Sequence, residues 1–304
     1  MLNHEPETIS TEGLPVMAAG VHATVYRTGG ERIVKLYNPG ISRGETEKEF
    51  ALTREAHRLG VPAPAAYGMV KCGERFGIEF EMIRGETLGH AIAAAPEQLD
   101  GYAERYAALV RLLHGTRTRQ AVFPELKSEL RRKLPLLEAF CTGSDIALLD
   151  ELTGLIPDSD SLIHGDLHPG NIIIRDGQLI MIDLPEMMRG SPLWDLAAIY
   201  RDLIIGPMFP SRELEESIGM KAPLIARTGQ AFFRVYTGLE GKDLERYMDA
   251  MLPLYGMNTI FTIGTAEDRN EQNCAEIIPM LMTEAIRKHE DSLRAMLTEN
   301  EKGE

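Results

Sequence analysis

The chain has 304 residues, of which 44% are hydrophobic and 26% are charged, and its formal net charge at pH 7 is -14. This length and composition are typical of a globular protein with one large domain or two lobes, and they argue against a disordered chain. The acidic balance argues against a nucleic-acid or anionic-membrane partner, because polyanions need a basic surface.

The cysteines and the apolar segments bear on where the protein works. Cys72, Cys141 and Cys274 are far apart and form no Cys-x-x-Cys pair, which argues against a disulfide framework or a zinc site and favours a reducing compartment. The first ten residues are polar and acidic, so we expect no signal peptide. The most apolar long window, residues 193–209, holds three charged residues and is too charged to span a membrane. We therefore expect a cytoplasmic protein.

The first part of the chain carries the signals of a small antiparallel sheet and one helix. Apolar runs predict strands over residues 16–19, 23–27, 32–37, 66–70 and 76–83. Gly29-Gly30 predicts a turn between the second and third of these strands. A helix is predicted over residues 44–59, because Gly60 and two prolines close behind it form a strong stop signal.

The rest of the chain is mainly helical. Helical patterns cover residues 86–155 and the sequence from 193 onward, and a short β-rich patch at 161–183 separates them. We therefore expect an α+β, two-lobe protein. Residues 1–84 would form the small antiparallel-sheet lobe, and residues 85–304 would form the larger, mainly helical lobe.

The β-rich patch reads LIHGDLHPGNIIIRDGQLIMIDLPE and places polar groups beside buried strands. Asp176-Gly177 between two apolar runs is a strong hairpin signal and predicts a type I′ turn. With the turn there, Asn171 faces Ile182 and Asp183 lies one step further along. Asn171 and Asp183 therefore meet at the open end of the hairpin, about 5–8 Å apart.

A third polar group lies just upstream of this hairpin. Asp166 precedes Asn171 by five residues, in a loop whose glycines and proline make it tightly bent. Oxygen ligands such as Asn171 and Asp183 suit Mg²⁺, which proteins usually share with phosphates. A His-x-Asp-x-x-x-x-Asn segment, a hairpin and a further Asp match the phosphoryl-transfer arrangement of kinases. The alternative is structural, with the same side chains capping turns and satisfying local backbone groups.

HGDLHPGN, followed by IDL and PLWDLA, closely resembles the aminoglycoside phosphotransferase and choline kinase-like family of small-molecule kinases, which have a protein-kinase-like fold. The resemblance covers about residues 16–200. It implies that Asp166 is the catalytic residue, orienting the acceptor hydroxyl and accepting its proton, and that Asn171 and Asp183 hold Mg²⁺. It also implies that His164 braces this loop and that Asp195, in WDLA, supports it from below.

The same resemblance implies a nucleotide site in the first lobe. Lys35, in RIVKLY, would contact the ATP phosphates. Glu49 would be its partner, because it shares the inward face of the predicted helix, where a carboxylate needs a cation. The phosphate loop would lie in residues 18–26, where Gly20 is the only glycine and the Gly-x-Gly-x-x-Gly pattern is absent.

The stretch FEMIRGETL resembles the segment that joins the two lobes in these kinases. Backbone groups of Glu81 and Met82 would then meet the adenine, with Phe80 behind it. The alternative is an ordinary edge strand.

We expect transfer of the γ-phosphoryl group of ATP, with Mg²⁺, to a hydroxyl of a small molecule such as an aminoglycoside, an amino alcohol or a sugar-like compound. One alternative is a protein Ser/Thr kinase. Only 11 residues separate Asp183 from Asp195, which is short for a segment that holds a peptide, and no Ala-Pro-Glu triplet follows. A second alternative is a catalytically inactive nucleotide-binding regulator. The presence of every expected polar residue argues against it.

Overall fold

The structure is a computed structural model that describes residues 5–20, 22–266 and 269–300. It divides into two compact units. The sheet unit comprises Met1–Leu88 and Asn171–Met187, and the helical unit comprises Gly89–Gly170 and Met188–Glu304. The division differs from the expected one, since the hairpin after Asn171 belongs to the sheet unit.

The sheet unit is built on a six-stranded sheet in the order β1-β5-β6-β4-β3-β2. Its strands are β1 (Glu7–Thr8), β2 (Val16–Ala19), β3 (Ala23–Gly29), β4 (Arg32–Tyr37), β5 (Ala66–Cys72) and β6 (Arg75–Glu81). Neighbouring strands pair antiparallel, as expected, except that β1 pairs parallel with β5. Strand β1 is an addition that the sequence patterns did not predict.

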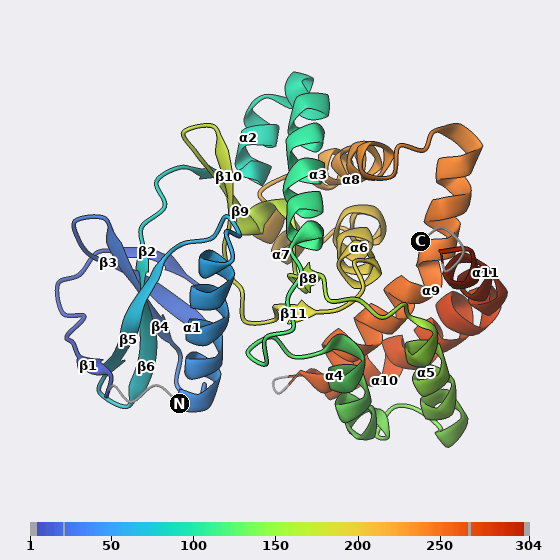
Figure 1. Cartoon of the computed structure of the whole chain (residues 1–304), viewed down its shortest axis with the longest axis horizontal. Coiled ribbons are helices and arrows are strands. Elements are labelled where there is room, and N and C mark those ends of the chain that lie inside the picture. The colour runs from blue at the N-terminus through green and yellow to red at the C-terminus, as the bar shows by residue number, and fades with distance from the viewer. Residues whose placement is uncertain (1–4, 21, 267–268, 301–304) are drawn as a thin grey trace. The chain divides into compact units, whose positions relative to one another are not determined.

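Helix α1 (Arg43–Arg58) lies against one face of this sheet (Figure 1). Ser42 and Glu45 form a capping box at its start, which satisfies two backbone N–H groups. Gly60 ends the segment with a φ of 84°, a conformation that favours glycine. Phe50 of α1 joins a buried apolar cluster with residues of β3, β4 and β6.

A second, three-stranded sheet holds the predicted hairpin. It consists of β10 (Gln178–Met181), β9 (Ile172–Arg175) and β7 (Glu86–Thr87), in that order. Asp176 and Gly177 both have positive φ, 49° and 77°, as a type I′ turn requires. The facing pairs run from Arg175 and Gln178 to Ile172 and Met181, so the predicted register is confirmed. Pairing of β9 with β7 ties the hairpin to the sheet unit.

The helical unit confirms the helical patterns predicted on both sides of the β-rich patch. Its helices are α2 (Leu88–Ala94), α3 (Leu99–Gly115), α4 (Leu126–Lys133), α5 (Gly143–Leu155), α6 (Leu193–Tyr200), α7 (Arg212–Ile218), α8 (Ala222–Thr237), α9 (Gly241–Thr265), α10 (Glu271–Met280) and α11 (Glu290–Asn300). Two short strands, β8 (Leu162–Ile163) and β11 (Met188–Arg189), pair antiparallel. Two π-helical segments, Arg201–Ile205 and Leu281–Ile286, follow α6 and α10.

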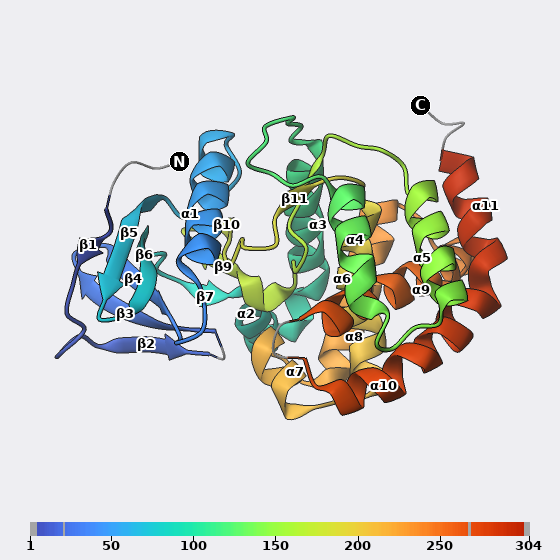
Figure 2. The same ribbon diagram turned by 90° about the horizontal axis from the view of Figure 1, so that it is seen from below.

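Helix α3 forms much of the core of this unit. It packs along α8 (Figure 2), where the rings of Tyr106 and Phe232 lie 4.5 Å apart. The Tyr106 hydroxyl donates a hydrogen bond to the carbonyl oxygen of Leu167, so α3 also holds the loop that carries Asp166. Among the described residues, no helix is long and apolar enough to cross a membrane.

Candidate active site

In the sheet unit, the open end of the hairpin brings Asn171 and Asp183 together. The N–H of Ile182 donates to the carbonyl oxygen of Asn171 over 2.9 Å, which continues the pairing of β9 and β10 by one step. Asp183 follows with a φ of 65°, a left-handed conformation that Asp tolerates better than most residues. Its side chain is 48% exposed. Asn171 and Asp183 therefore lie at the same end of the hairpin, as predicted from the turn.

Lys35 on β4 lies between two carboxylates of the same unit. Its Nζ is 2.6 Å from Oδ1 of Asp183 and 2.9 Å from Oε1 of Glu49. Burial alone would lower the pKa of Lys35, but the attraction of Glu49 and Asp183 outweighs burial and raises this pKa. Lys35 is therefore held as a cation, and the predicted partner Glu49 is the residue that α1 presents to it.

Tyr37 completes this group and was missed by sequence reasoning. Its hydroxyl donates to the second carboxylate oxygen of Glu49, whose side chain is only 3% exposed. Burial, and next the Glu49 carboxylate, raise the pKa of Tyr37, so its hydroxyl keeps its proton. The available signal was strand alternation, because Tyr37 lies two residues after Lys35 and so shares its face of the sheet.

In the stretch expected to contact the adenine, two backbone N–H groups donate hydrogen bonds within the sheet unit. The N–H of Glu81 donates to the carbonyl of Ala65 over 2.8 Å, and the N–H of Met82 donates to that of Glu31 over 2.9 Å. The Glu81 carboxylate pairs with Arg175 on β9. The backbone N–H groups of Glu81 and Met82 are therefore already hydrogen-bonded within this unit. Their role in binding a nucleotide stays a prediction.

The predicted phosphate loop is anchored at Gly20. Its N–H donates to the carbonyl oxygen of Ala23 over 2.9 Å, and its own carbonyl accepts from Nδ2 of Asn38 over 3.2 Å. Residue 21, at the centre of the loop, lies outside the described residues. Asn38 thus ties the end of β4 to the segment between β2 and β3. The contact of Gly20 with a phosphate stays a prediction.

In the helical unit, Asp195 supports the loop that carries the predicted catalytic residue. Asp195 is fully buried, and its carboxylate accepts from the backbone N–H groups of His164 (2.8 Å) and Gly165 (2.7 Å). Nε2 of His114 on α3 lies 3.1 Å from Oδ2 of the same carboxylate. The backbone N–H of Asp166 then donates to Nδ1 of His164 over 3.3 Å. His164 and Asp195 therefore shape this loop from inside the unit.

Asp166 itself contacts an arginine that the sequence did not single out. Nη2 of Arg201 lies 3.0 Å from Oδ1 of Asp166, and the same guanidinium pairs with Asp202, whose Oδ1 is 2.7 Å from its Nε. The Asp166 side chain is 43% exposed, and the Arg201 side chain is 19% exposed. No motif marked Arg201, which was only one of the charges in an apolar helix.

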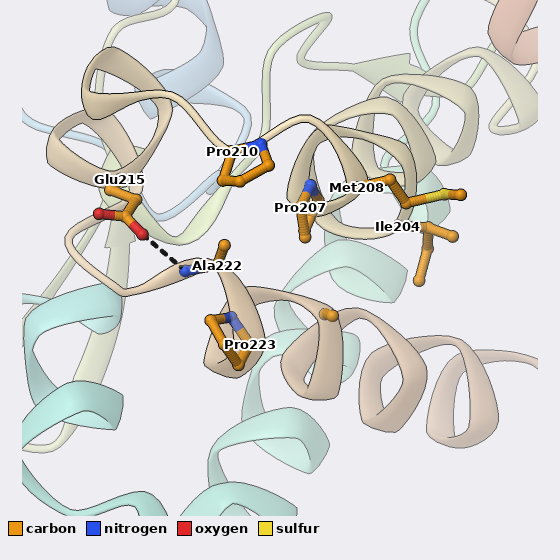
Figure 3. Close-up of a pocket in the computed structure, with 8 residues that line it drawn as sticks. Ile204, Pro207, Met208, Pro210, Glu215, Ala222 and Pro223 are labelled. Atoms are coloured by element: carbon orange, nitrogen blue, oxygen red, sulfur yellow. Dashed lines mark hydrogen bonds between the residues drawn. The ribbon is translucent and has the colours of Figure 1, made fainter.

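A separate pocket of about 410 Å³ lies in the helical unit beside α7 and α8. It is lined mainly by apolar residues such as Ile204, Met208 and Pro223 (Figure 3). The acidic residue in its lining, Glu215, is already hydrogen-bonded, because Oε1 accepts from the N–H of Ala222 at the start of α8. None of the predicted site residues lines this pocket.

The sheet unit with its Lys–Glu pair, the mainly helical unit and the His-x-Asp-x-x-x-x-Asn loop before a hairpin define a phosphoryl-transfer enzyme of the protein-kinase-like class. The profile of the phosphotransferase enzyme family matches residues 14–216, and the chain belongs to this family. The resemblance of HGDLHPGN and PLWDLA and the expected fold are therefore confirmed. No curated protein matches the sequence significantly.

Solved structures of several kinases are similar to this chain. ADP-bound aminoglycoside phosphotransferase APH(2'')-Ib is 17% identical, with a TM-score of 0.60 over 89% of this chain and 92% of the other. A choline/ethanolamine kinase family protein from Mesorhizobium loti is 16% identical, with a TM-score of 0.58 over 94% and 92%. The amicoumacin kinase hAmiN, in complex with AMP-PNP, Ca²⁺ and Ami, is 14% identical, with a TM-score of 0.54 over 92% and 90%. At these identities the likeness shows the fold.

Proposed function

We propose that this phosphotransferase moves the γ-phosphoryl group of ATP, with Mg²⁺, to a hydroxyl group of a small molecule. The observation that carries the proposal is the position of Lys35 between Glu49 and Asp183, at 2.9 and 2.6 Å. Protein kinases use a strand lysine paired with a helix glutamate for the same purpose. A purely structural lysine would not need a half-exposed carboxylate as its second partner.

The residues of the sheet unit fit a nucleotide and a hard cation. Asn171 and Asp183, at the same end of the hairpin, would offer amide and carboxylate oxygens, the donor types that Mg²⁺ prefers. When bound, Mg²⁺ would neutralise phosphate charge that Lys35 alone cannot balance. Lys35, oriented by the buried Glu49, would bind the phosphates.

Asp166 is the residue that would receive the acceptor. In the proposed reaction, the hydroxyl oxygen of the acceptor forms a bond to the γ-phosphorus while the bond to the β–γ bridging oxygen breaks. ADP leaves, and the hydroxyl proton passes to the Asp166 carboxylate. His164 and Asp195 would hold the loop of Asp166 in place through the hydrogen bonds described above.

A small-molecule acceptor is favoured over a protein by the segment between Asp183 and α6. Strand β11 pairs with β8, the N–H of Arg189 donates to the carbonyl of Pro124, and the N–H of Gly190 donates to that of Ser161. This short segment is hydrogen-bonded into the helical unit, which supports the view that it does not hold an extended peptide.

The similar kinases suggest which acceptors to test, since they include aminoglycoside, choline/ethanolamine and amicoumacin kinases by name. The experiment measures ADP release from Mg-ATP with a panel of kanamycin, choline, ethanolamine, glucose and homoserine. Asp166→Ala should lower acceptor-dependent release by at least about 10²-fold. Asp100→Asn, which changes a carboxylate that is 78% exposed on α3, should leave it unchanged.

Acceptor-dependent release at the wild-type rate in Asp166→Ala would contradict the role of Asp166. Absence of release with every acceptor and also with a mixed protein substrate would contradict the function itself and favour a nucleotide-binding regulator. Release with protein alone would favour the protein-kinase alternative. The cytoplasmic location expected from the cysteine spacing remains part of this proposal.

A further inference from the structure

The guanidinium of Arg201 has a hydrogen-bond partner for each of its three nitrogens. Nε and Nη2 form a fork with Asp202, at 2.7 and 2.9 Å. Nη1 donates to Oδ1 of Asn258 over 3.0 Å and lies 3.4 Å from Oγ1 of Thr262, both on α9. The remaining contact is Nη2 to Oδ1 of Asp166, at 3.0 Å. Two separate helical elements thus fix the group that touches Asp166.

A local irregularity of the backbone accompanies this position. Helix α6 ends at Tyr200, and Arg201 opens a π-helical segment in which the N–H of Gly206 donates to the carbonyl of Arg201. Pro207 follows and has no N–H to continue an α-helical pattern. Such π-helical turns occur often at functional sites. The segment presents Arg201 toward the catalytic loop.

We propose that Arg201 is a positioning residue that sets the orientation of the Asp166 carboxylate for the acceptor hydroxyl. This inference rests on the proposed function. Oδ1 of Asp166 faces Arg201, whereas Oδ2 lies 3.8 Å from Nε2 of His168. The two oxygens therefore have different neighbours, and Oδ1 faces a guanidinium that its fork with Asp202 and its contacts with α9 hold in place.

The contacts favour positioning over a direct role for Arg201 in binding a substrate anion. Two carboxylates, those of Asp166 and Asp202, already share its single positive charge. An anionic substrate group would have to displace one of them. Arg201 therefore affects the reaction by orienting Asp166. Of these two side chains, that of Asp166 is the more exposed.

The test is a double-mutant cycle with Arg201→Met and Asp166→Asn. The kcat and the KM for Mg-ATP are measured with whichever acceptor of the panel gives the fastest ADP release. We expect Arg201→Met to lower kcat by about 10²-fold, the effect of a misplaced reacting group, with little change in the KM for Mg-ATP. In the Asp166→Asn background, Arg201→Met should change kcat by less than about 3-fold, because the amide that replaces the carboxylate cannot accept the hydroxyl proton wherever it is positioned.

Two further variants separate positioning from folding. Arg201→Lys keeps the charge without the fork and should recover part of the lost kcat. If Arg201→Met does not fold, Arg201→Lys replaces it in the double-mutant cycle with Asp166→Asn. The matched control is Arg234→Met, which removes another arginine of this unit, paired with Asp100 at the surface, and should keep the wild-type kcat.

An active wild type whose Arg201→Met and Arg201→Lys variants keep their kcat overturns the inference alone. An equal loss in both backgrounds also overturns it, because Arg201 would then act independently of Asp166. A wild type that is inactive with every acceptor overturns the proposed function, and this inference with it.

Discussion

The ammonium group of Lys35 lies 2.6 Å from Oδ1 of Asp183, although the two residues are 148 positions apart in the chain. This contact joins the middle of the six-stranded sheet to the residue that follows the second sheet. Glu49 lies on the other side of the same ammonium. Because two carboxylates share one cation, the group has a net negative charge, which suits a further cation at Asp183.

Removing the cation should affect both stability and activity. Lys35→Met leaves the carboxylate of Glu49, which is 3% exposed, without its charge partner, and breaking a buried ion pair costs about 3–5 kcal/mol. We expect a lower urea midpoint and a fall in kcat/KM for Mg-ATP of at least about 10²-fold. Lys48→Met, on the exposed side of α1, is the control. Wild-type kcat/KM in Lys35→Met would rule out the phosphate-binding role.

Tyr37 should contribute to the same group through its hydroxyl alone. Tyr37→Phe removes the hydrogen bond to the buried Glu49 carboxylate, and an unsatisfied buried acceptor costs about 1–3 kcal/mol. We expect a lower midpoint of thermal unfolding and a higher KM for Mg-ATP, because Glu49 then holds Lys35 less firmly. Tyr67→Phe, on an exposed tyrosine of β5, serves as the control. If both variants unfold at the wild-type temperature, Tyr37 has no supporting role.

Asp195 should make the stability of the helical unit depend on acidic pH. Burial alone would raise the pKa of Asp195, but the hydrogen bonds from His114 and the His164 N–H outweigh burial and hold this pKa below its ordinary value. The ionised carboxylate therefore contributes stability that is complete above the unfolded-state pKa of about 4. This contribution is lost as the pH falls through the lower folded-state pKa.

The measurement is the urea midpoint of wild type and Asp195→Asn from pH 7 down to acid. Asp195→Asn should lower the midpoint at pH 7, because an amide cannot accept from all three donors as the carboxylate does. The difference between the two proteins should shrink below about pH 4. Parallel curves over the whole range would show that ionisation of Asp195 does not stabilise the fold.

Local chemistry made part of the site predictable from the sequence. The register of the hairpin followed from Asp176-Gly177, because a two-residue turn needs positive φ at both positions and so determines every facing pair. The end of α1 was placed to within one residue, since the stop signal at Gly60 is also local. The family resemblance suggested that Lys35 and Glu49 form a pair. The strand that holds Lys35 and the inward helix face that holds Glu49 then predicted their contact.

Contacts between distant elements were beyond the sequence patterns. The side-chain direction of Asp183 depends on a left-handed backbone that no turn rule required. The contact of Arg201 with Asp166 depends on a π-helical turn and on α9 packing beside it. The parallel pairing of β1 with β5 joins segments that are more than 60 residues apart. Each of these features is set by tertiary packing, which a single sequence expresses only weakly.

The glycine just before Asn171 offers a test of how closely the loop from Asp166 to Asn171 is packed. A Cβ added at Gly170 would lie 1.9 Å from the carbonyl oxygen of Ser217, at the end of α7. A backbone atom cannot move aside as the end of a side chain can, so Gly170→Ala must displace either α7 or the loop itself. We expect a loss of stability of about 1–3 kcal/mol and a lower kcat, because Asp166 and Asn171 flank the displaced segment.

The matched control is Gly101→Ala, on the exposed side of α3, where a Cβ would meet nothing within 4 Å. Alanine there should raise stability by about 0.5–1 kcal/mol, since it restricts the unfolded chain and favours the helix. Urea unfolding and ADP release are measured for both variants. If Gly170→Ala keeps both the stability and the kcat of the wild type, the loop does not pack against Ser217 in the active enzyme, and the positions of Asp166 and Asn171 do not depend on α7.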